Sequence, residues 1–146
     1  LNKNREISFM FKILKYTIFI CLLFINVSFA KVINVDNTQL KKLLKKDISI
    51  IDIRTSNEWN ETGVIPNSLL ITFFDKRGNY NLKQWHEKLL ENSSYKKDII
   101  IICRSGRRTK IAADIISKKL GINVYNVTYG IKSWIASNEP LLKLQN

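Results

Sequence analysis

The chain has 146 residues with 24 Lys or Arg and 12 Asp or Glu, which give a formal net charge of +12 at pH 7. Beyond an N-terminal segment at 1–30, residues 31–146 suffice for one domain with one core and exclude a second domain. The charge favours anionic partners. However, the lysines are spread over helices and loops without interleaved aromatic residues, which argues against nucleic-acid binding.

The N-terminal segment has the pattern of an export signal. Lys12 and Lys15 form a basic start, residues 16–25 are an apolar core, and Ser28-Phe29-Ala30 offers small residues at the positions that a signal peptidase reads. We predict cleavage after Ala30, with Met10 as a candidate for the true start. The apolar core is shorter than the roughly 20 residues of a membrane span, so no stable span is expected after cleavage. The protein is therefore predicted to be periplasmic or otherwise exported.

From residue 32 onward, apolar runs alternate with helical patterns. Strands are predicted at 32–35, 48–53, 69–72, 98–102 and 123–127. Between and after them, the predicted helices are, in chain order, a helix capped by Asp36, a helical turn capped by Ser56, a helix over 82–89, a helix over 109–120 and a short helix at 131–136. This alternation predicts an α/β fold with a mainly parallel sheet.

Three details of this pattern make specific predictions. Asp36 is expected to form a capping box with Gln39. The run at 98–102 is the most apolar, so we place it in the middle of the sheet. In the helix over 109–120, four apolar residues are expected to face inward: Ile111, Ile115, Ile116 and Leu120.

A cysteine follows the predicted central strand directly, at the start of Cys103-Arg104-Ser105-Gly106-Arg107-Arg108. Ligands of open α/β sheets bind beyond the carboxyl ends of the strands. The next helix begins here, and its unpaired N–H groups and the three arginines would stabilise a thiolate. Gly106 would allow a positive φ, so that successive N–H groups point toward a bound anion. We predict Cys103 as the nucleophile, with the other five residues binding substrate: Arg104, Ser105, Gly106, Arg107 and Arg108.

Other roles of this cysteine fit the sequence less well. A buried and inert Cys103 would leave the neighbouring arginines and glycine without a packing reason. A phosphatase of the Cys-x5-Arg type needs an arginine six residues after the nucleophile, where this chain has Thr109. Removal of Cys21 with the signal would leave Cys103 alone, which excludes an intramolecular disulfide. No clustered metal ligands or nucleotide-binding loop are present in the sequence, so no metal or cofactor is expected.

Four segments resemble motifs of one family. They are Ile51-Asp52-Ile53-Arg54 with Glu58-Trp59, Gly63-Val64-Ile65-Pro66-Asn67-Ser68, the segment from Cys103 to Thr109, and Tyr129-Gly130-Ile131-Lys132-Ser133-Trp134. In this order they resemble a single-domain rhodanese, and the chain is similar to small exported sulfurtransferases of the phage-shock type. Two positions depart from the pattern: Val64 stands where the family usually has histidine, and Tyr129 where it has glycine.

The resemblance implies a five-stranded, mainly parallel sheet with helices on both faces. It also implies transfer of sulfane sulfur from thiosulfate or a similar small anionic donor to a thiophilic acceptor, through a Cys103 persulfide. Arg104 and Arg107 are candidates for holding the donor, with Arg108 as a third. Asp52 and Arg54 either reach the pocket rim or pair to hold a loop. The alternatives are a persulfide carrier, which would deliver sulfur to a protein without efficient turnover, and an anion-binding module.

Overall fold

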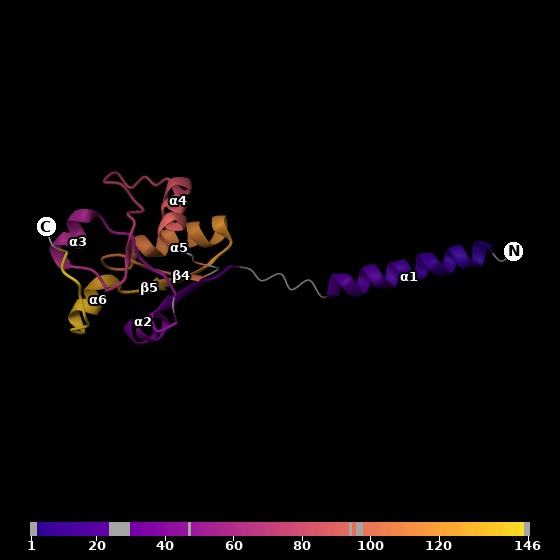
Figure 1. Cartoon of the computed structure of the whole chain (residues 1–146), viewed down its shortest axis with the longest axis horizontal. Coiled ribbons are helices and arrows are strands. Elements are labelled where there is room, and N and C mark those ends of the chain that lie inside the picture. The colour runs from indigo at the N-terminus through magenta and orange to yellow at the C-terminus, as the bar shows by residue number, and fades with distance from the viewer. Residues whose placement is uncertain (1–2, 24–29, 47, 94, 96–97, 145–146) are drawn as a thin grey trace.

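The computed structural model describes residues 3–23, 30–46, 48–93, 95 and 98–144. Its strands are β1 (Val32–Val35), β2 (Ile50–Asp52), β3 (Leu69–Leu70), β4 (Asp98–Ile102) and β5 (Asn123–Val127). Its helices are α1 (Lys3–Leu23), α2 (Asn37–Leu44), α3 (Ser56–Thr62), α4 (Leu82–Asn92), α5 (Arg107–Leu120) and α6 (Gly130–Ala136). All pairings in the five-stranded sheet are parallel, in the order β1-β5-β4-β2-β3, so the predicted α/β class is confirmed (Figure 1).

The strand β4 lies in the middle of the sheet, as its apolar sequence predicts. Because side chains alternate along a strand, Ile99 and Ile101 face one core cluster, and Ile100 and Ile102 face the other. All four isoleucines are fully buried. Cys103 continues the first alternation, so its side chain lies on the same face of the sheet as Ile99 and Ile101.

Helices cover both faces, as expected from the resemblance. One core cluster joins the sheet to Trp85 and Leu89 of α4 and to Ala112, Ala113 and Ile116 of α5. The other joins it to Leu40 and Leu43 of α2 and to Ile131 and Trp134 of α6. The sheet is thus the middle layer of three, and its carboxyl edge is where the loops after β2, β3 and β4 leave it.

The strands predicted at 32–35, 98–102 and 123–127 are confirmed, whereas two others are shorter than predicted. β2 covers only the middle of 48–53, although the Ile53 N–H still donates to the Ile102 carbonyl at 3.0 Å. β3 lies at the edge of the sheet and pairs with β2 through two residues, although the N–H groups of Ile71 and Phe73 still donate to the Asp52 and Ile53 carbonyls, each at 3.2 Å. Short edge strands are common because they offer little unpaired backbone to other chains.

Two helix predictions need correction, and one is confirmed. Asp36 and Gln39 form the predicted capping box of α2. The N-cap of α3 is Thr55 instead of Ser56, because the Glu58 carboxylate accepts from both the N–H and the hydroxyl of Thr55, each at 3.2 Å. Ile111 was predicted to face inward but is 58% exposed. The stripe of α5 that packs on the sheet instead consists of Thr109, Ala112, Ala113, Ile116 and Ser117.

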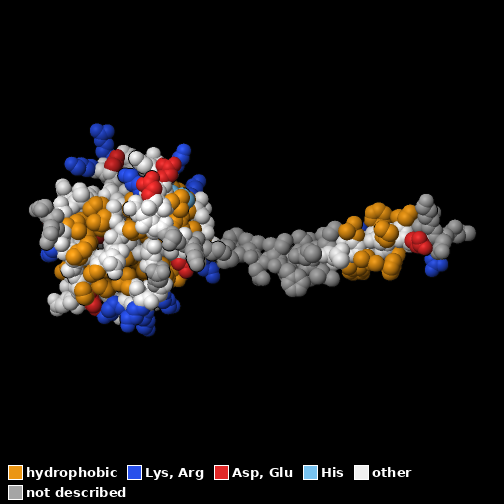
Figure 2. Space-filling model, in the orientation of Figure 1, with side chains coloured by type: hydrophobic (Ala, Val, Ile, Leu, Met, Phe, Trp, Pro, Cys, Tyr) orange, Lys and Arg blue, Asp and Glu red, His pale blue; other side chains and the backbone are white. Residues whose placement is uncertain are grey.

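Helix α1 lies outside the α/β unit in Figure 1. Apolar side chains are exposed along it, as Figure 2 shows in orange: Phe9, Met10, Phe11, Ile13, Leu14 and Tyr16. Within the described part of the chain, no helix combines the length and the apolar character needed to cross a membrane. Ser28 and Phe29 of the predicted cleavage site lie outside the described residues.

Candidate active site

Cys103 follows the carboxyl end of β4, and its side chain points under the N-terminus of α5. Its Sγ accepts a hydrogen bond from the Gly106 N–H at 3.2 Å, and Cys103 is 1% exposed. Gly106 is the N-cap of α5, with φ 88° and ψ −13°, which is the positive φ that the sequence predicts for this loop. The sulfur therefore lies where the first-turn N–H groups and the dipole of a 14-residue helix favour a negative charge.

The loop 103–108 is held from behind by the start of α6. The Cys103 carbonyl accepts from the Ile131 N–H at 2.8 Å, and the Arg104 carbonyl accepts from the Lys132 N–H at 3.1 Å. In a trans peptide the N–H points opposite to the carbonyl of the same unit. The N–H groups of Arg104 and Ser105 therefore point away from α6, and they can contribute to a ring of anion-binding amides.

Two glycines make this close approach possible. A Cβ on Gly106 would lie 1.7 Å from the Thr128 carbonyl oxygen, and a Cβ on Gly130 would lie 2.5 Å from the Cys103 carbonyl oxygen. Both glycines also have positive φ, 88° and 60°. The shape of the loop thus depends on contacts between its backbone and the segment 128–130 that leads into α6.

Thr109 provides a second polar contact for the sulfur. Its hydroxyl lies 3.6 Å from the Cys103 Sγ and donates to the Gly106 carbonyl at 3.1 Å, and the residue is fully buried. The same hydroxyl can turn its one proton toward the sulfur when the sulfur is anionic. In the sequence, Thr109 was named as the end of the motif and as the position without a phosphatase arginine, and the residue was given no role at the sulfur. Its place in the first turn of α5, three residues after the N-cap, is the signal that could have identified it.

The three arginines of the loop differ in their surroundings. Arg104 and Arg107 are exposed, and Arg104 lies 3.9 Å from the Glu61 carboxylate at the surface. Arg108 instead donates two hydrogen bonds, of 2.8 and 2.6 Å, to the two carboxylate oxygens of Glu58 on α3. Arg104 and Arg107 are therefore exposed to an anion from solvent, with Glu61 as a weak competitor for Arg104, whereas Arg108 links the loop to α3.

This ion pair shifts both ionisation equilibria. Hydrogen bonds from Arg108 lower the pKa of Glu58 from 4.5 to about 2, against the opposing effect of burial. The pKa of Arg108 is raised, first by the hydrogen bonds to Glu58 and then by the negative charge of Glu58. The two residues stay charged at neutral pH. The sequence pattern did not identify Glu58 as the partner of Arg108, and because it placed the cap at Ser56 it also did not identify the capping box of Thr55 and Glu58.

Asp52 and Arg54 form a second ion pair at the end of β2. Both side chains are fully buried, and the Arg54 Nη2 lies 2.6 Å from an Asp52 carboxylate oxygen. Arg54 also donates to the Gly63 carbonyl at 2.9 Å and to the Thr62 hydroxyl at 2.7 Å. The pairing considered from the sequence is thus present, and it holds the segment after α3. Neither side chain is exposed at a pocket mouth.

Glu58→Gln should lower the free energy of unfolding at pH 7 by about 1–2 kcal/mol, because it removes a half-buried charged pair. A carboxyl group whose pKa is lower in the folded than in the unfolded state stabilises the folded state. This stabilisation is complete at a pH above the unfolded pKa, and it is lost as the pH falls through the folded pKa. The unfolding free energy of the wild type should therefore decline from pH 4.5 to about 2 more steeply than that of the variant. Urea denaturation at several pH values measures both curves.

Glu87→Gln is the matched control, since it removes the same charge from an exposed position on α4. It should leave the stability at pH 7 and its dependence on acid close to those of the wild type. Equal pH dependence in the wild type and in Glu58→Gln would contradict the assigned ion pair.

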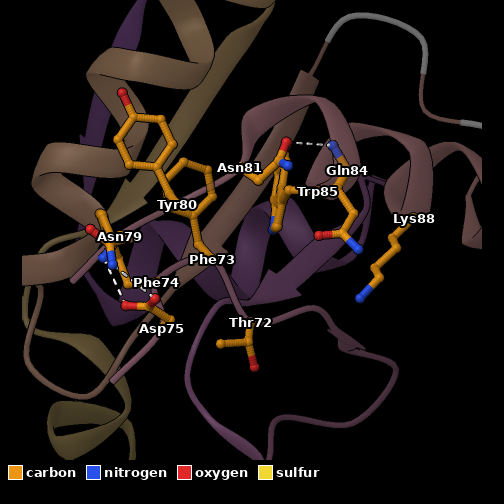
Figure 3. Close-up of a pocket in the computed structure, with 10 residues that line it drawn as sticks. All are labelled: Thr72, Phe73, Phe74, Asp75, Asn79, Tyr80, Asn81, Gln84, Trp85 and Lys88. Atoms are coloured by element: carbon orange, nitrogen blue, oxygen red, sulfur yellow. Dashed lines mark hydrogen bonds between the residues drawn. The ribbon is translucent and has the colours of Figure 1, made fainter. Parts of the chain in front are cut away.

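A separate cavity of about 340 Å³ lies beside α4 (Figure 3). Its walls include four aromatic residues from the loop after β3 and from α4: Phe73, Phe74, Tyr80 and Trp85. Phe73 stacks on Tyr80 with ring centroids 5.2 Å apart. None of residues 103–108 lines this cavity, so it is distinct from the site around Cys103.

Comparison with known proteins agrees with this geometry. The uncharacterized protein RP600 of Rickettsia prowazekii is 28% identical over 106 residues, which cover 67% of this chain and 85% of that protein. A rhodanese-related protein from Thermoplasma volcanium is 27% identical with a TM-score of 0.59, covering 77% of this chain and 99% of that one. The polysulfide-sulfur transferase of Wolinella succinogenes shares the fold, with a TM-score of 0.58 at 19% identity over 76% of this chain and 78% of that one. The model of the rhodanese-like domain matches residues 36–137, which include the loop 103–108, and the chain belongs to this family.

Proposed function

We propose that the protein is a sulfurtransferase that carries sulfane sulfur as a persulfide on Cys103. The observation that carries this proposal is the hydrogen bond from the Gly106 N–H to the Cys103 Sγ at the N-terminus of α5. A persulfide sulfur bound there would meet amides instead of apolar side chains. The family supports the same chemistry, since one structural neighbour is a polysulfide-sulfur transferase.

The first step is attack of the Cys103 thiolate on the donor. We propose thiosulfate as the donor, as in the small exported sulfurtransferases of the phage-shock type that the motifs resemble. The thiolate forms a bond to the outer sulfur, the S–S bond of thiosulfate breaks, and sulfite leaves with the electron pair. Arg104 and Arg107 are the exposed cations that can hold the sulfonate oxygens of the donor.

The second step returns the enzyme to its starting state. A thiophilic acceptor such as cyanide attacks the outer sulfur of the persulfide, and the S–S bond to Cys103 breaks. The Cys103 thiolate leaves, and it is stabilised again by the Gly106 N–H and by the Thr109 hydroxyl. Neither step needs a metal or an oxidant, since the sulfur moves as a neutral atom between nucleophiles.

Steady-state turnover separates an enzyme from a carrier. We expect thiocyanate to form from thiosulfate and cyanide over many turnovers, in amounts far above the enzyme concentration. Formation of one persulfide per chain with negligible turnover would favour a carrier that delivers sulfur to a protein. An absence of both products would leave an anion-binding module and contradict the proposal.

We also propose that residues 1–30 act as a cleaved export signal, so that the domain works in the periplasm or outside the cell. This rests on the basic start, the apolar core and the small residues before Lys31. N-terminal sequencing of the exported protein should read Lys31 first. A mature protein that retains residues before Ala30 would contradict it.

A further inference from the structure

Five exposed side chains belong to the loop that holds Cys103 and to the helix starts beside it. Four are cations and one is aromatic, and they are here called the collar: Arg104, Arg107, Lys110, Tyr129 and Lys132. Tyr129 is 64% exposed and the Arg104 side chain 46%. Cys103 itself is 1% exposed, whereas the loop that holds it and the two helix starts beside this loop carry exposed side chains.

Backbone contacts join the members of the collar into one surface. Arg107 and Lys110 are three residues apart at the start of α5, so their side chains share one face of that helix. Tyr129 and Lys132 have the same spacing at the start of α6. The two helix starts meet at the loop, because the Thr128 backbone packs against Gly106 and the Lys132 N–H donates to the Arg104 carbonyl.

The charge of this surface is strongly positive. In the part of the chain that the structure describes, the acidic residue within 4.0 Å of a collar cation is Glu61, which lies beside Arg104 and is itself 60% exposed. Asp114 lies one turn beyond Lys110 on α5 and is the next acidic residue along that helix. An acidic partner would therefore be attracted to this surface beside Cys103, and its approach would be faster at low salt.

Tyr129 indicates a macromolecular partner instead of a small ion. An exposed aromatic ring gains nothing from a hydrated anion such as cyanide or sulfite, but it buries a large apolar area against a polypeptide. Tyrosine and arginine are also the residues that most often dominate binding at protein interfaces. The backbone of Tyr129 has φ −103°, so the position would accept many other residues.

We propose that the collar docks an acidic segment of a protein that carries the sulfur-accepting cysteine. This rests on the proposed persulfide at Cys103. The thiolate of the docked cysteine attacks the outer persulfide sulfur, a new S–S bond forms on the partner, and the bond to Cys103 breaks with return of the Cys103 thiolate. The partner leaves as a persulfide, so atoms and electrons balance without a further reactant.

A peptide series tests the proposal on the full chain. Cys103 is loaded once with thiosulfate, and the excess donor is removed. The rate of sulfur transfer is then measured to two hexapeptides, each with one cysteine. One peptide carries four Asp or Glu residues, and the other carries Asn or Gln at the same positions. We expect transfer to the acidic peptide to be about tenfold faster at low salt, with the difference lost at high salt. Cyanide serves as the reference for the chemical step.

Variants of the collar locate the effect. Relative to the rate with cyanide, Lys132→Gln should slow transfer to the acidic peptide about threefold and Tyr129→Gly about tenfold. Lys119→Gln, at the far end of α5, and Tyr80→Ala, on the loop beside α4, are controls that remove the same groups elsewhere. They should leave the ratio of the two peptide rates as in the wild type.

The outcomes separate this inference from the proposed function. A persulfide that forms and reacts with cyanide, but that transfers equally fast to both peptides, would overturn the docking surface and leave the sulfurtransferase. Equal effects of Lys132→Gln and Lys119→Gln would overturn it as well, as would glutathione reacting as fast as the acidic peptide. A chain on which no persulfide forms would overturn the proposed function itself and the inference with it.

Discussion

Cys103→Ser should reduce sulfur transfer from thiosulfate to cyanide to the rate without enzyme. The serine hydroxyl can still accept the Gly106 N–H, but it cannot form a persulfide, so both steps of the transfer are lost. The fold should be unchanged, because the side chain differs by one atom at a buried position. Thiocyanate formation and thermal unfolding measure the two effects separately.

The second cysteine of the chain provides the control for this variant. In the full chain, before removal of residues 1–30, Cys21 lies in α1, outside the α/β unit, and Cys21→Ser should keep full activity. If Cys103→Ser retained a substantial part of the wild-type rate, the nucleophile would have to be another group, and the proposed mechanism would fail.

Gly106→Ala should lower sulfur transfer by about 100-fold or more, since it displaces the N–H group that binds the sulfur. The added Cβ would lie 1.7 Å from the Thr128 carbonyl oxygen and 2.7 Å from its carbon. These are backbone atoms, so no side-chain rotation relieves the overlap. A positive φ of 88° adds strain for any residue other than glycine, and we expect a loss of about 2–4 kcal/mol in stability.

Gly78→Ala is the control that separates the backbone strain of a positive φ from the steric overlap of the added Cβ. Gly78 has a φ of 83°, close to that of Gly106, but a Cβ there meets nothing within 4 Å. This variant should cost about 1 kcal/mol and leave sulfur transfer intact. Equal activities of the two alanine variants would show that the contact between Gly106 and Thr128 does not shape the site.

The sequence was most informative where a single strong pattern decides the local structure. Four isoleucines after Asp98 predicted a buried central strand, because only a strand covered on both faces can bury every side chain. The capping residues Asp36 and Gln39 marked the start of α2 for a similarly local reason. The position of Cys103 follows from these elements, since parallel strands place their carboxyl ends, and the loops after them, at one edge.

The sequence was least informative where contacts between distant segments decide the outcome. Ile111 is apolar but exposed, because the face of α5 that packs on the sheet is set by small residues such as Ala112 and Ala113, which allow close approach. The helix pattern alone did not show this preference. Ile111 therefore lies nearly opposite the buried stripe, about 170° around the helix from its centre.

The roles of the arginines show the same limit. Adjacent residues Arg107 and Arg108 look alike in sequence, yet one is exposed and the other is paired with Glu58, which lies 50 residues earlier in the chain. Arg54 is likewise held by Asp52 in the interior. Which cations remain for an anionic donor depends on the position of α3, and no local pattern specifies that position.

The most direct test of a persulfide at Cys103 is the intact mass of the protein after exposure to thiosulfate and removal of the excess. We predict a gain of one sulfur atom, located on the peptide that contains Cys103 and removed by cyanide. A mass that does not change, or a sulfur found only on Cys21, would contradict the account.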